Sequence, residues 1–321
     1  MAKAPARGAT TSGLALAAAV AQRFYVENQT KVRIADELGI SRFKVARLLA
    51  DAQGAGLVQI RVQVPADVDG ELGEALRARF GLRAAYVVRP AGTAVPEQRR
   101  AVAQFTAGLL EETVAPEDVV GLAWGRTVSQ LVAALSAPLR ARFVQLAGAL
   151  PRPDVEGSAV DLVRRAAEAT GSGAATFYAP LAVPDAATAD SLRSQPEIAR
   201  ALAELDALTR AVVSIGAWLP GESTALDSLD PATAASLAAA GVVAEITGVL
   251  LGADGAEVPG LADRVVGVTG GQLRRAGEVV AMSTGAAGVR AGATAAALRS
   301  GLVGTLVTHA DLARAVLDLP G

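Results

Sequence analysis

Two glycine-rich segments of the sequence carry cationic and hydroxyl side chains in an order that suits anion binding. One segment is Gly125, Arg126 and Thr127, directly after an apolar run; the other spans residues 283–290. A glycine-rich loop that enters a helix exposes backbone N–H groups, which favour an anion such as phosphate. Loops of this composition also serve as plain tight turns, and residues 283–290 match neither a Walker motif nor a dinucleotide fingerprint. The candidate contacts in the second loop are Gly285, Gly288 and Arg290.

Three other polar sites have both a functional and an ordinary interpretation. Residues 214–224 follow an apolar run and contain serine, glycine and threonine, which suits a third ligand-binding loop. Glu245 stands among apolar residues, where it can line a site or form an ordinary ion pair. His309 is the single histidine and follows an apolar run. A lone histidine at such a position is more often a cap or a surface residue than a catalytic base.

The residue types exclude several kinds of chemistry. The chain has no cysteine, which removes disulfides, thiolate metal sites and thiol nucleophiles. One histidine also removes multi-histidine metal sites, so we expect no metal and no cofactor. The absence of cysteine fits a cytoplasmic protein. No uninterrupted apolar run approaches about 18 residues, so no membrane span is expected.

A second group of functional side chains is basic and lies near the N-terminus. Thr30 and Ser41 are placed to cap two helices, from Lys31 to Leu38 and from Arg42 to about Ala55. The outward face of the second of these helices offers arginine, which can pair with guanine through two hydrogen bonds. Basic residues at the start of the first suit phosphate contacts. The expected contacts to double-stranded DNA are Lys31, Arg33, Ser41, Arg42, Phe43, Lys44 and Arg47.

The spacing of three small or apolar residues explains how these helices would be arranged. Ala35 sits where two helices must approach closely, Gly39 suits a left-handed turn, and Val45 would fill the core between the helices. A preceding apolar face from Leu14 to Tyr25 supplies another helix. This pattern predicts a helix-turn-helix whose last helix lies in the major groove.

The charge distribution favours the same interpretation. Residues 1–65 carry nine Lys or Arg and four Asp or Glu, a net charge of +5, while the remainder has a net charge of −7. A basic head on an acidic body suggests that the head binds a polyanion. Residues 57–64 alternate apolar and polar side chains up to Pro65, which predicts a strand that could form a wing with Arg61 near DNA. A small helical bundle with a solvated basic face remains the alternative.

The rest of the chain alternates strand-like and helix-like stretches, which predicts a mainly parallel sheet covered by helices. Ligands of such sheets bind at the carboxyl ends of the strands. The expected strands are Ala85–Val88, Val119–Ala123, Phe143–Leu146, Ala175–Tyr178, Ala211–Ile215, Val265–Val268, Val279–Met282 and Thr305–Val307. The expected helices include Gln98–Thr113, Val128–Leu135, Asp161–Thr170, Ile198–Leu208 and Gly292–Arg299, after a connecting helix from Glu71 to Phe80.

In these motifs the chain resembles the SorC/DeoR-type sugar-binding transcriptional regulators. The resemblance rests on residues 34–42, 45–49 and 56–60 in the N-terminal part, and on 121–127, 144–148, 241–248, 254–255, 295–299 and 306–308 in the larger part. It implies a Rossmann-like α/β effector domain related to sugar-phosphate isomerases and CoA transferases but used for binding. It also implies a homodimer or homotetramer and a phosphorylated sugar as effector. Family ligand contacts carry over to Gly125, Arg126, Thr127, Gln145 and the loop from Gly285 to Arg290.

Three positions depart from the family pattern. Family members commonly have Lys where Arg290 stands, and an arginine keeps the charge but cannot form a Schiff base. They often have Asp where Glu245 and His309 stand, so the polar end of the pocket would differ in shape. An unphosphorylated sugar or a polyol therefore stays open as the effector.

Taken together, the sequence predicts a DNA-binding domain over residues 1–65 and an effector domain over residues 66–321. The expected function is transcriptional regulation of carbohydrate or polyol metabolism. One alternative is a sugar-phosphate isomerase-like enzyme with an appended helical domain, in which Glu245 and His309 would be the available bases. Another is a protein-interaction module with a basic helical head.

Overall fold

A computed structural model describes residues 11–58, 67–150 and 158–320, and the chain separates into two compact units, residues 1–63 and 64–321. The N-terminal unit contains α1 (Thr11–Ala21), a π-helical turn η1 (Gln22–Val26), α2 (Lys31–Leu38) and α3 (Arg42–Gly54). Their contact faces share a small core of apolar side chains, among them Val20, Ile34, Val45, Leu48 and Leu49. The predicted wing strand spans residues 57–64, of which 59–64 lie outside the described residues.

The helix boundaries in this unit follow from local side-chain chemistry, as the sequence predicts. The hydroxyl of Thr30 accepts from the backbone N–H of Arg33, and that of Ser41 accepts from the N–H of Lys44, each at 3.2 Å. Gly39 ends α2 in the left-handed conformation, at φ 63°. Ala35 and Val45 are both buried between the helices, so the predicted close approach of α2 and α3 is confirmed.

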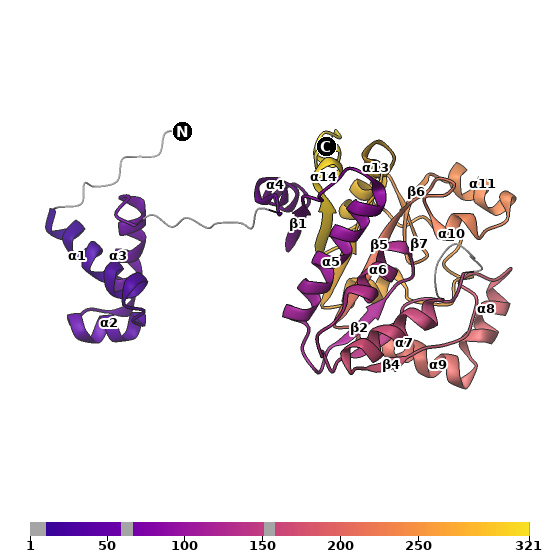
Figure 1. The fold of residues 1–321 in the computed structure, drawn as a ribbon, viewed down its shortest axis with the longest axis horizontal. Helices are drawn as coiled ribbons and strands as arrows, with labels where there is room; N and C mark the ends of the chain where they lie inside the picture. Colours follow the sequence, from indigo (N-terminus) through magenta and orange to yellow (C-terminus); the bar gives the residue numbers. More distant parts are fainter. Residues whose placement is uncertain (1–10, 59–66, 151–157, 321) are drawn as a thin grey trace. The chain divides into compact units, whose positions relative to one another are not determined.

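The larger unit is built on a parallel sheet, which confirms the predicted fold class (Figure 1). Seven strands run in the order β1-β9-β8-β5-β2-β3-β4, and every neighbouring pair is parallel. Their bounds are β1 Ala84–Val88, β2 Val119–Leu122, β3 Arg142–Gln145, β4 Gly173–Ala175, β5 Arg210–Ala217, β8 Glu278–Met282 and β9 Thr305–His309. A hairpin of β6 (Val242–Ile246) and β7 (Val249–Gly252) adds antiparallel to the end of β5.

Helices connect the strands and pack on the sheet (Figure 1). α5 and α6 lie against each other, while α13 packs on β5 and β6. Their bounds are α4 Gly70–Phe80, α5 Val95–Thr113, α6 Arg126–Ala134, α7 Ala159–Thr170, α8 Ala186–Arg193, α9 Pro196–Ala203, a 3-10 turn η2 Glu204–Ala207, α10 Thr224–Asp227, α11 Pro231–Ala239, α12 Gly270–Arg275, α13 Ala287–Arg299 and α14 Ala310–Leu317. In the described part of the chain, no helix has both the length and the apolar character needed to cross a membrane.

Two predicted strands are wrong, and hydrogen bonding explains why. The strand expected at Ala175–Tyr178 is β4, which ends at Ala175, because the backbone N–H of Phe177 donates to the side chain of Gln145 instead of to a neighbouring strand. The strand expected at Val265–Val268 makes only isolated bridges, from Val265 to Ala182 and from Gly267 to Ala147. The helix expected at Ile198–Leu208 is divided into α9 and η2, and α13 begins five residues before the predicted Gly292.

Candidate functional site

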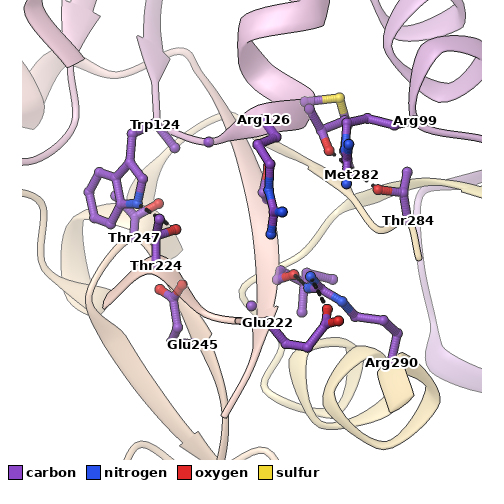
Figure 2. A pocket seen from close by; sticks show the side chains of 16 residues that line it. Arg99, Trp124, Arg126, Glu222, Thr224, Glu245, Thr247, Met282, Thr284 and Arg290 are labelled. Atoms are coloured by element: carbon purple, nitrogen blue, oxygen red, sulfur yellow. Dashed lines mark hydrogen bonds and ion pairs between the residues drawn. The ribbon is translucent and has the colours of Figure 1, made fainter. Parts of the chain in front are cut away.

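A polar cleft opens at the carboxyl ends of β2, β5 and β8, which are neighbours in the centre of the sheet (Figure 2). It measures about 550 Å³ with the open solvent at its mouth included. Parallel strands end at the same edge of a sheet, so the loops that follow β2, β5 and β8 converge there. The polar side chains that line it are Arg99, Trp124, Arg126, Thr127, Ser214, Glu222, Thr224, Glu245, Thr247, Thr284 and Arg290.

Three guanidinium groups from three helices line this cleft. Arg126 begins α6, Arg290 lies in the first turn of α13, and Arg99 projects from α5. Burial lowers the pKa of Arg99, and the positive charges of Arg126 and Arg290 lower it further. The three cations are therefore close enough to repel one another, and an anion bound among them would relieve that repulsion.

Arg290 is the most firmly held of the three. Its Nη2 is 2.7 Å from the Glu222 carboxylate, and its Nη1 donates to the carbonyl of Ile215 at 2.7 Å. Its Nε is buried and has no hydrogen-bond partner among the described residues. Burial lowers the pKa of Arg290, against the opposing effect of Glu222. An unused N–H beside a paired one leaves room for a further acceptor.

Glu245 lies on the antiparallel strand β6, near enough to Arg290 for that positive charge to act on its carboxylate. It pairs with Gly216 of β5, where a side-chain Cβ would come within 2.4 Å of the Glu245 carboxylate, so a larger residue there would displace the Glu245 side chain. The carboxylate accepts from the backbone N–H of Gly248 at 3.2 Å and from the hydroxyl of Ser223 at 3.4 Å. Burial nevertheless raises the pKa of Glu245 to about 6. In Figure 2 it lies on the side of Arg126 away from Arg99 and Arg290.

Two buried hydroxyls in the cleft have no hydrogen-bond partner among the described residues, the Oγ of Ser214 and the Oγ1 of Thr247. Thr247 is 2% exposed and adopts φ 53° in the turn between β6 and β7. A β-branched residue in that conformation costs on the order of 1–3 kcal/mol and is typical of functional sites. Buried, unsatisfied hydroxyls suit a ligand that itself carries hydroxyl groups.

The predicted effector contacts divide into two groups. Gly125, Arg126, Thr127, Glu245 and Arg290 line the cleft, and Thr127 Oγ1 lies 3.3 Å from the Thr284 hydroxyl. Gly125 directly precedes α6 as its N-cap residue, at φ 129°, a conformation that favours glycine.

The other group lies beside the cleft rather than in its lining. Gln145 is buried, and its amide bonds the backbone of Ala147 and Phe177. Gly285 packs against the side chain of Arg290, while Gly288 is exposed in α13. His309 is buried with Nε2 3.1 Å from the carbonyl of Gly285, and burial lowers its pKa.

Several lining residues were not singled out from the sequence. Arg99 sits in a charged stretch at the start of α5, where its type and spacing resemble those of any solvated helix face. Glu222 lies on the loop after β5, where serine and threonine are the residues that suggest ligand binding. Thr247 was visible in the sequence as a Thr-Gly pair between two apolar runs, which is a weak hairpin signal.

In the N-terminal unit, the residues predicted to contact DNA all lie on the exposed surface. Arg42, Phe43, Lys44 and Arg47 project from the first two turns of α3; Phe43 is 74% exposed, with the Arg42 guanidinium 5.2 Å from its ring centre. Arg33 pairs with Glu37 at 2.9 Å, so its charge is partly neutralised. The exposed, cationic start of a helix-turn-helix second helix is the surface that such units insert into the major groove.

A helix-turn-helix unit in one chain with an α/β unit that carries a polar cleft defines a ligand-responsive DNA-binding regulator. Residues 65–318 match the family model described as "Putative sugar-binding domain". The transcriptional regulator LsrR of Klebsiella pneumoniae is 30% identical over 326 residues, covering 96% of each chain. The sorbitol operon regulator of Klebsiella pneumoniae is 35% identical over 113 residues, which span 35% of this chain and 36% of that relative.

A solved structure extends the comparison to the fold of nearly the whole chain. The full-length sorbitol operon regulator SorC of Klebsiella pneumoniae superimposes with a TM-score of 0.72 at 23% identity, covering 96% of this chain and 100% of that one. The chain therefore belongs to the SorC/DeoR-type family of sugar-binding transcriptional regulators. These relatives are regulators, so the isomerase-like alternative has no support among them.

Proposed function

We propose that this chain regulates carbohydrate or polyol metabolism by binding operator DNA through residues 1–65, under the control of a phosphorylated sugar bound by residues 66–321. The observation that carries the effector class is the group of three guanidiniums in one cleft. Among the described residues, Glu222 is the one carboxylate that forms an ion pair with these three guanidiniums, so the site retains positive charge. A phosphate group carries a charge of about −1.5 to −2 at pH 7, and planar guanidinium groups bind it well.

The other polar groups of the cleft account for the sugar part of the ligand. Glu245, Ser214 and Thr247 offer one carboxylate and two unsatisfied hydroxyls, which can bond the hydroxyl groups of a sugar or polyol. Among the described residues, no cluster of acidic or histidine side chains is suited to a metal ion. The ligand would thus be oriented by its own two ends, with phosphate toward the arginines and hydroxyls toward Glu245.

The DNA-binding half of the proposal rests on the exposed start of α3. Arg42 and Arg47 would read base edges, Lys31 and Arg33 would contact phosphates, and Ser41 would fix the start of the reading helix. We further propose a homodimer or homotetramer on a symmetric operator with half-sites separated by whole turns of about 10 base pairs. Such a protein would act in the cytoplasm, where its DNA lies.

Thermal unfolding of the full chain with a panel of sugars, polyols and their phosphates tests the effector class. A ligand at about 100 times its Kd stabilises the folded state by about 2.7 kcal/mol, which gives a visible rise in Tm. We expect the rise with a sugar phosphate and not with the matching free sugar. A rise with free sugars alone would contradict the anionic effector. The ligand that succeeds should then change the protein's affinity for duplexes selected from a random DNA pool.

A further inference from the structure

Glu222 occupies a position in the cleft that an anionic ligand would need. Its carboxylate is the ion-pair partner of Arg290, at 2.7 Å from Nη2. The two side chains differ in how firmly they are held, since that of Glu222 is 34% exposed and that of Arg290 is 11% exposed. Arg290 also keeps its bond to the carbonyl of Ile215 on β5. If the pair separates, Glu222 is therefore the partner that leaves.

The loop that carries Glu222 also engages a second arginine of the cleft. The carbonyl of Gly221 accepts from Arg126 Nη2 at 3.0 Å. Gly221 adopts φ 78°, and the neighbouring Leu219 is 48% exposed. Residues 219–222, named here the β5 loop, thus occupy donors of both Arg126 and Arg290. The residues on either side of this loop are anchored: the Trp218 N–H donates to the Val243 carbonyl at 3.0 Å, and the Ser223 hydroxyl accepts from the Leu226 N–H at 3.1 Å. The loop itself has local bonds, from Leu219 N–H to the Ala217 carbonyl at 2.7 Å, from Glu222 N–H to the Leu219 carbonyl at 3.0 Å and from Gly221 N–H to Asp227 at 2.9 Å.

We propose that Glu222 is a built-in competitor of the effector: its carboxylate fills the anion position beside Arg290, and the effector's phosphate displaces it together with the β5 loop. This inference rests on the proposed anionic effector. A monoanionic ligand would replace one carboxylate by another, with little gain in charge interaction. A phosphate monoester brings about twice that charge to the same cations, so it can overcome the competition. Glu222 thereby raises the negative charge that a ligand needs in order to bind, which favours phosphorylated sugars over sugar acids.

Inorganic phosphate and acetate are the probes, titrated at pH 7.5 and constant ionic strength into the full chain. Three proteins are compared by calorimetry: the wild type, Glu222→Gln, and Glu204→Gln as a matched control. Glu204 is 29% exposed and pairs with Arg142 at 2.6 Å outside the cleft. We expect Glu222→Gln to bind phosphate at least about tenfold more tightly than the wild type, and to bind acetate at concentrations where the wild type does not. Glu204→Gln should match the wild type.

Equal or weaker phosphate binding by Glu222→Gln would overturn the inference, because it would make Glu222 a support that orients Arg290. Phosphate binding by the wild type would still uphold the anion site in that case. Absence of phosphate binding in both proteins would overturn the anion site and the inference together. Amide hydrogen exchange supplies a second measurement on the wild type alone. Phosphate should speed exchange in residues 219–222, and slower exchange there would mean closure over the ligand and not displacement.

Discussion

The two units of this chain build their functional surfaces in different ways. In the N-terminal unit, the exposed residues of α3 are close together in sequence, and one helix with one cap places them. In the larger unit, the cleft brings together Arg99, Arg126, Glu245 and Arg290 from four separate elements. The first surface depends on short-range geometry, whereas the second depends on the order of strands in the sheet. A change in one unit should therefore leave the other's binding intact.

The largest expected effect is that of Arg290→Gln on ligand binding. It removes a side chain that is held by Glu222 and Ile215 and faces the proposed phosphate. Loss of a buried, hydrogen-bonded charge pair costs about 2–5 kcal/mol. We expect phosphate binding by calorimetry to weaken by more than about 30-fold, with DNA affinity unchanged. Arg274→Gln is the control, since Arg274 pairs with Glu257 outside the cleft. Retained phosphate binding would place the anion elsewhere.

In the N-terminal unit, Arg42→Ala should weaken the binding of operator DNA. If Arg42 bonds a base, its removal weakens binding to the selected operator by about 1–3 kcal/mol and relaxes specificity at that base pair. Fluorescence anisotropy with the selected and a scrambled duplex measures both quantities. Arg100→Ala, an exposed arginine of the larger unit, is the control and should behave as wild type. Unchanged specificity in Arg42→Ala would leave Arg42 only its contact with Phe43.

The same contrast explains what the sequence could predict. Thr30, Gly39 and Ser41 act on backbone groups within five residues of themselves, so their caps and turn follow from the sequence alone. The parallel sheet and the two glycine-rich loops after β2 and β8 were also predictable, because apolar runs followed by glycine and helical spacing are local signals. The seven predicted DNA contacts are correspondingly all on the exposed surface.

Features that depend on distant partners were not predictable in this way. Arg99 joins the cleft only because α5 packs beside α6. The hairpin of β6 and β7 was missed because its turn uses Thr247 at positive φ, where an Asn-Gly pair would have signalled it. β4 ends early because Gln145 takes the backbone N–H of Phe177, a bond between residues 32 positions apart.

Glu245 should make the stability of the larger unit depend on pH, because a buried carboxyl destabilises the folded state when it is charged. Its pKa is raised from 4.5 to about 6, so the folded state binds this proton more tightly than the unfolded state does. Stability contributed by the protonated form is lost as pH rises from about 4.5 through 6, by about 2 kcal/mol. Glu245→Gln removes that loss.

The free energy of unfolding of the larger unit, measured in urea at pH 4.5 and pH 7.5, tests this effect. We expect Glu245→Gln to gain about 2 kcal/mol relative to the wild type between those pH values. Glu168→Gln, at an exposed position, should show no such gain. A constant difference between Glu245→Gln and the wild type would mean that the hydrogen bonds from Ser223 and Gly248 offset the burial of the carboxylate.

The smallest expected effect is that of Lys31→Ala, which separates phosphate contact from base reading within the N-terminal unit. Lys31 is exposed at the start of α2, with its ammonium 5.6 Å from the ring centre of Phe24. A lysine that contacts one DNA phosphate contributes about one unit to the slope of log affinity against log salt. We expect Lys31→Ala to reduce that slope by about one and to weaken selected and scrambled duplexes by the same factor, less than about tenfold. Unequal weakening of the two duplexes would mean that Lys31 reads sequence, and the division of roles between α2 and α3 would be wrong.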